Sequence, residues 1–348
     1  MPVKTIDCDM LISVNNVSII DVRSPKEFFQ GHIFAAHNIP LFENEEREEV
    51  GKAYKQRGRE DAIELGLKIV GSKLHEFISR TKKISPEKKI IIHCWRGGMR
   101  SESFAWLLNL AGFEVYKLHK GYKAYRNFVL QTFEKKIQII ILGGMTGSRK
   151  SEILKSIADA GEQIIDLESL ANHKGSAFGQ IGMHPQPTQE QFENNLSHAL
   201  NKLDVTKPIW VEDESHAVGL VRIPNALFSQ MREAPVVKIE VSKEERVKHL
   251  INGYASAPYG ELKNALEKIQ KRLGGLNTSL ALDALEKKDF AAVASLSLEY
   301  YDKAYNFGLA KRSPYNIYNL ALEKISDKEN ANKIIEYAYN NITYRKRS

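Results

Sequence analysis

An apolar run at residues 137–142 leads directly into a glycine-rich segment and then into a helical pattern. The glycine-rich segment, residues 144–151, reads Gly-Met-Thr-Gly-Ser-Arg-Lys-Ser, and residues 152–157 carry apolar side chains at helical spacing. A loop between a buried strand and a helix presents backbone N–H groups to phosphate oxygens. The segment therefore predicts an α/β domain that binds a phosphorylated ligand.

The glycine-rich segment follows the Walker A pattern, except that Arg149 stands where the last glycine is expected. In this pattern Lys150 reaches the terminal phosphates and the Ser151 hydroxyl can ligate Mg²⁺. The predicted phosphate-binding residues are Gly144, Thr146, Gly147, Ser148, Arg149, Lys150 and Ser151. The alternative interpretation is a glycine-rich turn that is followed by Lys-Ser by chance.

Three carboxylates, Glu212, Asp213 and Glu214, follow a strand predicted at residues 208–211. An acidic residue at a strand end beside a phosphate loop can hold a metal ion or orient a hydroxyl group. Acidic strand ends are also common on protein surfaces. The phosphate loop favours the functional interpretation, and the choice between Glu212 and Asp213 stays open.

A second strand–loop–helix segment surrounds Cys94, with a buried strand at residues 89–92 and a helix at 102–110. Backbone N–H groups, the positive end of the helix and the charges of Arg96 and Arg100 favour the thiolate, so that Cys94 becomes a nucleophile or a chalcogen carrier. The predicted anion loop consists of Trp95, Arg96, Gly97, Gly98, Met99 and Arg100. A buried core thiol is the alternative interpretation.

Five residues separate Cys94 from Arg100. This is one more than in a common sulfurtransferase loop and equals the count in cysteine phosphatases, so the loop accepts a larger or tetrahedral group. A dual-specificity phosphatase is therefore a rival interpretation of the N-terminal half. Such an enzyme needs an acid for its leaving group and is not expected to carry a phosphate loop.

The chain of 348 residues is long enough for two domains. Short apolar runs alternate with helical patterns up to about residue 130, and a second alternation starts at Lys136. We predict a parallel-sheet domain at 1–130 and a second α/β domain at 136–348, in which 243–348 is largely helical after a capping box at Ser242.

Composition indicates the kind of partner and the cellular compartment of the protein. The net charge of +7 fits a polyanionic partner. The two cysteines and the charged start of the chain predict a reduced, cytoplasmic protein, with Cys8 as a structural residue in an N-terminal strand region. No membrane span and no zinc-type ligand spacing are expected.

The chain resembles the tRNA 2-selenouridine synthases, bacterial enzymes with a rhodanese domain followed by a P-loop domain. The resemblance covers nearly the whole chain and is far more specific than either short motif. The matching strings lie at 21–28, 31–33, 46–47, 50–51, 54–56, 94–101, 166–168, 171–179, 186–187, 189–190, 192–193, 211–215 and Gly219. The resemblance implies a rhodanese-like parallel-sheet domain and a P-loop NTPase-like α/β domain with a helical C-terminal extension.

The resemblance also implies a reaction at the wobble 2-thiouridine of certain tRNAs. Enzymes of this family attach a geranyl group from geranyl diphosphate to the 2-thio sulfur and then replace the thioether with selenium from selenophosphate. Cys94 would serve the selenium step, and the P-loop would bind a diphosphate or a nucleotide. The implied partners are tRNA and an enzyme that produces selenophosphate. Which loop holds which anion, whether a nucleotide is bound, and the oligomeric state do not follow from the residues.

Two positions depart from the family pattern, Arg149 and His216, where glycine and arginine are expected. His173 and Lys174 lie in a glycine-containing loop within a matching string, and we expect them to contact substrate rather than to form a solvated loop. A second hypothesis, from another class, is a redox- or anion-sensing binding protein with an inactive P-loop. Arg149 is the feature that favours it.

Basic and tyrosine residues recur along the C-terminal helical part. A tRNA-binding surface needs positive charge for phosphates and aromatic rings for exposed bases, whereas solvated helix faces are the alternative. The residues of this predicted tRNA contact are Lys263, Lys268, Lys271, Arg272, Lys311, Arg312, Arg345, Lys346 and Arg347, with Tyr254, Tyr259, Tyr301, Tyr305 and Tyr315.

Overall fold

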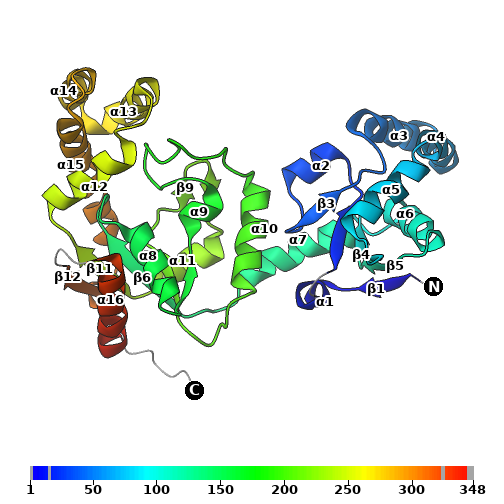
Figure 1. Ribbon diagram of the computed structural model, residues 1–348, viewed down its shortest axis with the longest axis horizontal. Helices are drawn as coiled ribbons and strands as arrows, with labels where there is room; N and C mark the ends of the chain where they lie inside the picture. Colours follow the sequence, from blue (N-terminus) through cyan, green and yellow to red (C-terminus); the bar gives the residue numbers. More distant parts are fainter. Residues whose placement is uncertain (1–2, 15–16, 323–325, 343–348) are drawn as a thin grey trace. The chain divides into compact units, whose positions relative to one another are not determined.

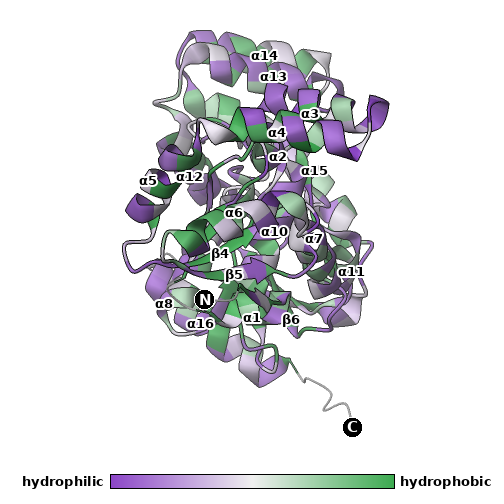
Figure 2. Ribbon diagram, turned by 90° about the vertical axis from the view of Figure 1, so that its right-hand side faces the viewer, coloured by the Kyte–Doolittle hydropathy of each residue, from purple (hydrophilic) through white to green (hydrophobic). Residues whose placement is uncertain are grey.

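The computed structural model describes residues 3–14, 17–322 and 326–342 (Figure 1). Apolar residues concentrate in the strands, as Figure 2 shows for β4 (Lys89–His93). Within the described ranges, no helix combines the length and the apolar character needed to cross a membrane.

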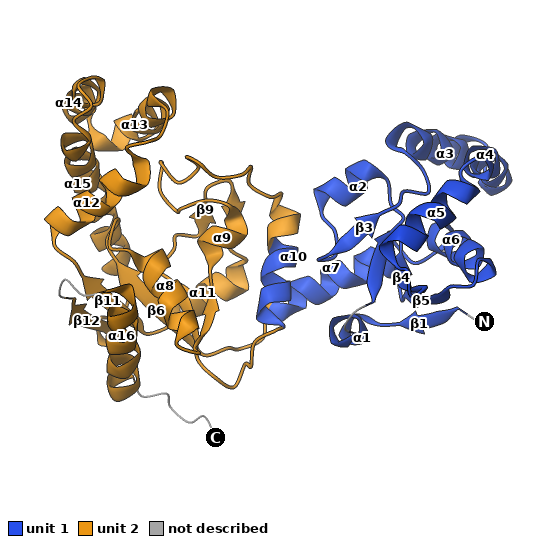
Figure 3. Cartoon of the chain, viewed as in Figure 1, with its two compact units in different colours: residues 1–132, 193–201 blue, residues 133–192, 202–348 orange. Residues whose placement is uncertain are grey.

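The chain divides into two compact units (Figure 3). The first comprises Met1–Thr132 and Glu193–Asn201, and the second comprises Phe133–Phe192 and Lys202–Ser348. Each unit is built on a five-stranded sheet in which the paired strands are parallel. The predicted α/β class is therefore confirmed in both halves.

The sheet of the first unit has the strand order β1-β5-β4-β2-β3. Its strands are β1 (Lys4–Ile6), β2 (Ser18–Asp21), β3 (Ala36–Asn38), β4 (Lys89–His93) and β5 (Glu114–Leu118). Its helices are α1 (Cys8–Ser13), α2 (Pro25–Gln30), α3 (Asn44–Gln56), α4 (Arg59–Gly71), α5 (Leu74–Ile84), α6 (Met99–Leu110) and α7 (Gly121–Thr132).

β4 lies in the middle of this sheet because its side chains are apolar on both faces. Ile90, Ile91 and Ile92 are all buried, as expected for a strand that is covered on both sides. The carboxyl ends of β2 and β4 lie side by side, with Asp21 paired to His93. In parallel sheets this is the edge at which ligands bind, and it is where the Cys94 loop begins.

The sheet of the second unit has the strand order β12-β11-β6-β8-β7. Its strands are β6 (Ile139–Gly144), β7 (Gln163–Ile165), β8 (Ile209–Glu212), β11 (Val236–Glu240) and β12 (Ile317–Ala321), and a separate antiparallel pair consists of β9 (Ala217–Val218) and β10 (Val221–Arg222). Its helices are α8 (Lys150–Asp159), α9 (Leu167–Ala171), α11 (Asn225–Glu233), α12 (Lys243–Tyr254), α13 (Tyr259–Leu273), α14 (Gly275–Glu286), α15 (Phe290–Leu309) and α16 (Asp327–Asn341), with a short 3₁₀ turn at Pro314–Asn316. α10 (Gln189–Leu200) contributes residues to both units.

Two local predictions need correction. Residues 317–321 are not helical, since β12 pairs in parallel with β11 and adds an edge strand to the sheet. Cys8 is the first residue of α1 rather than part of a strand, because the Asp7 carboxylate accepts the Met10 N–H and starts a helix there. The predicted helix start after Ser242 is confirmed, since the Ser242 hydroxyl accepts the Glu245 N–H at the start of α12.

Candidate functional sites in the two units

The Cys94 loop connects the end of β4 to the start of α6, as the sequence predicts. Cys94 is only 3% exposed, and its Sγ lies 3.2 Å from the Ser101 Oγ. The loop is fastened to the start of α7, because the Tyr122 N–H donates to the Cys94 carbonyl and the Lys123 N–H donates to the Trp95 carbonyl, both at 2.9 Å. The thiol is thus held in a fixed place at the sheet edge.

Glycine is required where this loop meets the start of α7. Gly97 has a φ of +69° and Gly121 a φ of +60°, a conformation that side chains rarely adopt. A Cβ atom at Gly121 would lie 2.3 Å from the Cys94 carbonyl oxygen. Even alanine at position 121 would therefore push the loop out of place.

The two loop arginines have different surroundings. Arg100 is paired with Glu27 of α2, its Nη1 lying 2.7 Å from the Glu27 Oε2, whereas Arg96 is exposed. Burial acts to raise the pKa of Glu27, but the hydrogen bond and charge of Arg100 outweigh it and hold that pKa below its usual value. Trp95 and Met99 are 36% and 46% exposed, so both present apolar surface beside the loop.

A buried polar network that the sequence analysis did not single out supports the Cys94 loop. Arg23 donates to both carboxylate oxygens of Asp21 and to the Gly31 carbonyl, and its guanidinium lies 3.6 Å from the centre of the Tyr122 ring. His93 is fully buried beside this pair, and burial lowers its pKa to about 4, which keeps the imidazole neutral. The network fixes the ends of β2 and β4 beneath the loop.

The phosphate loop of the second unit lies between β6 and α8, where the sequence predicts it. Arg149 is the residue before α8 and has a φ of +62°, the left-handed conformation that glycine adopts without strain. For a non-glycine residue, this conformation costs ~1–2 kcal/mol of free energy. The Arg149 side chain turns to Asp327 at the start of α16, with which it forms an ion pair of 2.6 Å.

Three other side chains predicted to contact phosphate form hydrogen bonds in or beside the loop. The Lys150 Nζ donates to the Gly144 carbonyl at 3.0 Å, which folds the lysine back over the loop. The Ser151 hydroxyl donates to the Glu168 carboxylate at 3.0 Å. Ser148 is buried, and its hydroxyl donates to the Met145 carbonyl at 2.7 Å, so that side chain stabilises the turn itself.

Three glutamates converge beside Ser151. One carboxylate oxygen from each of Glu168, Glu212 and Glu214 lies within 4.8 Å of the others. Glu168 comes from α9 and was not among the predicted site residues, whereas Glu212 and Glu214 come from the predicted acidic strand end. The signal that could have found Glu168 is its place at the carboxyl end of β7, because the ends of parallel strands meet at one edge of the sheet.

The pKa values of two glutamates in this cluster, Glu212 and Glu214, lie above the usual glutamate value. Burial, and then the charge of Glu168, raise the pKa of Glu212 to about 8. Burial and the charges of Glu168 and Glu212 also raise the pKa of Glu214 well above its usual value. Glu212 Oε1 is buried without a hydrogen-bond partner. Converging carboxylates that repel one another, one of them with an oxygen that lacks a donor, fit a divalent cation such as Mg²⁺.

Asp213 points away from this cluster. Its Oδ1 accepts from the Arg312 Nη2 at 2.6 Å, and Arg312 also donates to the Met231 carbonyl. Of the two residues between which the sequence left the choice open, Glu212 belongs to the glutamate cluster, whereas the Asp213 carboxylate pairs with Arg312. Arg312 is only 6% exposed, so its prediction as a tRNA contact is wrong.

Other members of the predicted basic surface have varied surroundings. Arg272 donates to the Tyr300 hydroxyl at 2.9 Å. Tyr315 is 87% exposed and Tyr259 47%, as a base-contacting residue requires. Arg345, Lys346 and Arg347 lie outside the described residues.

The predicted substrate loop with His173 and Lys174 packs over the glutamate cluster. A Cβ atom at Gly175 would lie 2.8 Å from carboxylate oxygens of both Glu168 and Glu214, so the backbone closely covers these groups. His173 is buried with its Nδ1 unpartnered, and burial lowers its pKa. The Lys174 Nζ lies 5.4 Å from the centre of the Tyr254 ring.

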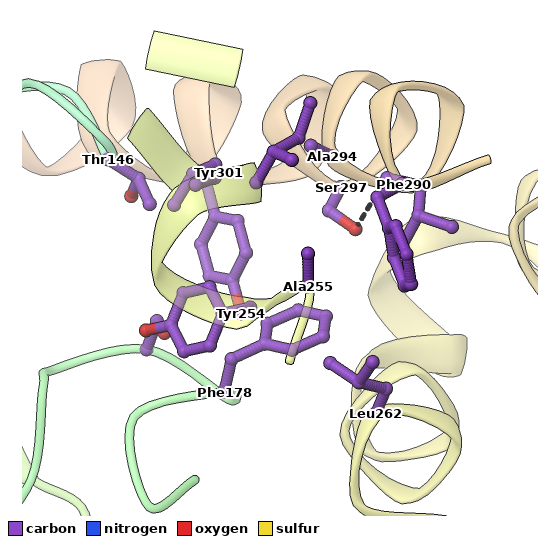
Figure 4. A pocket seen from close by; sticks show the side chains of 13 residues that line it. Thr146, Phe178, Tyr254, Ala255, Leu262, Phe290, Ala294, Ser297 and Tyr301 are labelled. Carbon is purple, nitrogen blue, oxygen red and sulfur yellow. Dashed lines mark hydrogen bonds between the residues drawn. The ribbon is translucent and has the colours of Figure 1, made fainter. Parts of the chain in front are cut away.

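An apolar pocket adjoins the phosphate loop. It spans about 500 Å³ when the space open to solvent is included, and its lining includes Thr146, Phe178, Tyr254, Leu262, Phe290 and Tyr301. In Figure 4, Thr146 of the phosphate loop lies at one side of the pocket and Leu262 and Phe290 lie at the other. Such a pocket accepts an apolar chain whose polar end reaches the phosphate loop.

Comparison with protein families agrees with this two-part organisation. Residues 8–128 match the rhodanese-like domain, and residues 137–334 match the family model described as the tRNA 2-selenouridine synthase AAA domain. The chain belongs to the tRNA 2-selenouridine synthase family. The resemblance noted in the sequence is thereby confirmed, and the chain is an enzyme of this type.

Individual relatives match over nearly their full length. The tRNA 2-selenouridine synthase of Sulfurovum sp. (strain NBC37-1) is 35% identical over 337 residues, which cover 87% of this chain and 91% of the relative. The synthase of Hydrogenovibrio crunogenus is 35% identical over 340 residues, with 86% and 91% covered. A crystal structure of the N-terminal domain of a protein named for ATP/GTP binding, from Clostridium difficile 630, aligns with 36% of this chain and 99% of its own, at 41% identity and a TM-score of 0.35.

Proposed function

We propose that this enzyme converts the wobble 2-thiouridine of tRNA to 2-selenouridine through an S-geranylated intermediate. In the first step the 2-thio sulfur attacks C1 of geranyl diphosphate, the C–O bond breaks, and diphosphate leaves. In the second step selenophosphate attacks C2 of the base through selenium, and the C–S bond breaks to release geranylthiol. Water then cleaves the Se–P bond, which yields 2-selenouridine and phosphate.

We assign the geranyl step to the second unit. The observation that carries this assignment is the apolar pocket whose lining includes Thr146 of the phosphate loop. An isoprenoid diphosphate needs an anion site and an apolar site next to each other, and each buried CH₂ group contributes ~0.8 kcal/mol. A nucleotide has less apolar surface than a geranyl chain to bury against the lining residues Phe178, Leu262 and Phe290.

The glutamate cluster fits Mg²⁺ in this proposal. Glu168, Glu212 and the Ser151 hydroxyl would hold the ion, which would offset the negative charge of the diphosphate leaving group. At neutral pH Glu212 binds a proton, because its pKa is about 8. Magnesium binding at this place therefore releases a proton, and it strengthens as the pH rises toward 8 and levels off above that pH.

We assign the selenium step to the first unit and to Cys94. Selenophosphate is a tetrahedral anion, and a turn with five residues between the cysteine and the arginine, as between Cys94 and Arg100, is of the length that accepts a tetrahedral group. The exposed Arg96 supplies a charge that no partner neutralises among the contacts of the described residues. Glu27 holds Arg100 in place at the same loop.

A bulky residue in the pocket tests the geranyl assignment. We expect Ala255→Trp to weaken binding of geranyl diphosphate at least tenfold, about 1.4 kcal/mol, since it removes space for roughly two CH₂ groups. Binding of inorganic diphosphate should change less than about twofold, because the phosphate loop is untouched. Isothermal titration calorimetry with both ligands measures the difference.

The neighbouring exposed residue provides the control for this prediction. Ser256 lies next to Ala255 but outside the pocket lining, so Ser256→Trp should bind both ligands as the wild type does. Equal loss of geranyl diphosphate and inorganic diphosphate binding in Ala255→Trp would contradict a chain-binding pocket.

We also propose that the C-terminal basic residues contact tRNA phosphates. Replacing Arg345, Lys346 and Arg347 by alanine should weaken binding of thiolated and unmodified tRNA about equally, and it should flatten the dependence of affinity on salt, because fewer counterions are released. Filter binding at several salt concentrations measures both effects. An unchanged salt dependence, or a loss confined to the thiolated tRNA, would show that these residues do not form the electrostatic contact.

A further inference from the structure

A buried side-chain hydroxyl lies beside the Cys94 sulfur. Ser101, in the first turn of α6, is fully buried, and its Oγ lies 3.2 Å from the Cys94 Sγ. The same hydroxyl lies 3.0 Å from the Gly98 carbonyl oxygen, which is itself 3.8 Å from Sγ. The Cys94 thiol, the Ser101 hydroxyl and the Gly98 carbonyl are therefore all within hydrogen-bonding distance of one another.

The hydrogen-bonding capacities of these groups differ between the two protonation states of Cys94. A thiol can donate to the Ser101 oxygen while the Ser101 hydroxyl donates to the Gly98 carbonyl. A thiolate only accepts, and a carbonyl cannot donate to it. In the thiolate state the Ser101 hydroxyl can rotate its hydrogen from the Gly98 carbonyl to Sγ.

We infer that Ser101 is a positioning residue that stabilises the Cys94 thiolate by donating a hydrogen bond to it. The inference rests on the proposed role of Cys94 in the selenium step. It gains weight from the ion pair between Arg100 and Glu27, because Glu27 neutralises part of the positive charge near the sulfur. A hydrogen bond to an ionised acceptor is about twice as strong as one between neutral groups.

The test follows the reactivity of Cys94 as a function of pH. The full-length wild type and Ser101→Ala are treated with iodoacetamide, and peptide mass spectrometry follows alkylation of Cys94 separately from that of Cys8. We expect the pH of half-maximal reactivity to rise by about one to two units in Ser101→Ala, as for the loss of one hydrogen bond to a charged group. An unchanged pH profile would overturn the inference.

Matched variants separate the hydroxyl from packing. Ser101→Thr keeps the hydroxyl and Ser101→Val has the same shape without it, so only the valine variant should show the shift, and this pair decides the question if Ser101→Ala does not fold. Ser103 lies in the same helix, and its hydroxyl donates to the Met99 carbonyl, so Ser103→Ala should keep the wild-type profile. Equal shifts in the threonine and valine variants would assign the effect to packing and overturn the inference.

This measurement does not depend on the proposed reaction. Formation of 2-selenouridine in tRNA is assayed separately with the wild-type protein. If the pH profile shifts as expected while the wild type makes no selenouridine, Ser101 still stabilises the thiolate and the proposed function fails. If selenouridine forms and Ser101→Ala keeps the wild-type profile, the proposed function stands and the role of Ser101 is rejected.

Discussion

Replacing Cys94 by alanine should reduce 2-selenouridine formation more than about 100-fold, because we assign the selenium step to the Cys94 loop and this variant lacks the reactive thiol of that loop. Geranyl transfer should continue, since we assign that step to the second unit. The S-geranylated nucleoside should therefore accumulate in tRNA. Mass spectrometry of nucleosides from tRNA treated with the purified variant measures both products.

Cys8 provides the matched control for Cys94. It is half-buried, and burial together with the charges of Asp9 and Asp7 raises its pKa to about 11, so the thiol is not a nucleophile at neutral pH. Cys8→Ala should form 2-selenouridine at the wild-type rate. Wild-type amounts of 2-selenouridine from Cys94→Ala, or a loss of the geranylated nucleoside as well, would contradict the assignment.

Replacing Lys150 by alanine should weaken binding of geranyl diphosphate more than tenfold, about 1.4 kcal/mol or more. The reason is the loss of a charge-assisted hydrogen bond to a phosphate oxygen. Because the geranylated intermediate precedes the selenium step, this variant should lose both tRNA products. Calorimetry with geranyl diphosphate measures the first effect, and nucleoside mass spectrometry measures the second.

Lys155 lies on the same helix and is exposed, so it controls for a general change of charge. Lys155→Ala should bind geranyl diphosphate with wild-type affinity. Unchanged affinity of Lys150→Ala for geranyl diphosphate and for nucleotides would show that this loop is not the phosphate site.

Local sequence signals predicted the central part of both units. The strand before Cys94 and the strand before Gly144 were found because a buried parallel strand is a continuous apolar run. Both loops were found because glycines and basic residues follow those runs directly. These features depend on neighbours in the chain, so the sequence alone carries them.

Features that depend on distant contacts were missed. Glu168, which follows β7, comes close to Glu212 at the end of β8 because these two strands pair. The partner of Asp213 is likewise distant in the chain, since its carboxylate pairs with Arg312. The sequence does not predict β12, because residues 317–321 mix polar and apolar side chains and the pairing of this strand with β11 is a contact between distant parts of the chain. The apolar pocket was missed for the same reason, since the residues that line it are far apart in the sequence, the first being Thr146 and the last Tyr301.

The conformation of Arg149 explains why its departure from the Walker A pattern does not disrupt the loop. The residue adopts the left-handed conformation that a glycine would take, and its side chain pairs with Asp327. The feature that favoured a binding protein with an inactive P-loop is thus accommodated by the fold.

Nucleoside analysis of cellular tRNA tests the central claim most directly. Bacteria that lack the gene for this chain should contain no 2-selenouridine in their tRNA and should regain it when the wild-type gene is returned. The gene with Cys94→Ala should restore only the S-geranylated nucleoside, and the gene with Lys150→Ala should restore neither. Persistence of 2-selenouridine in the cells that lack the gene, or its return with Cys94→Ala, would contradict the account.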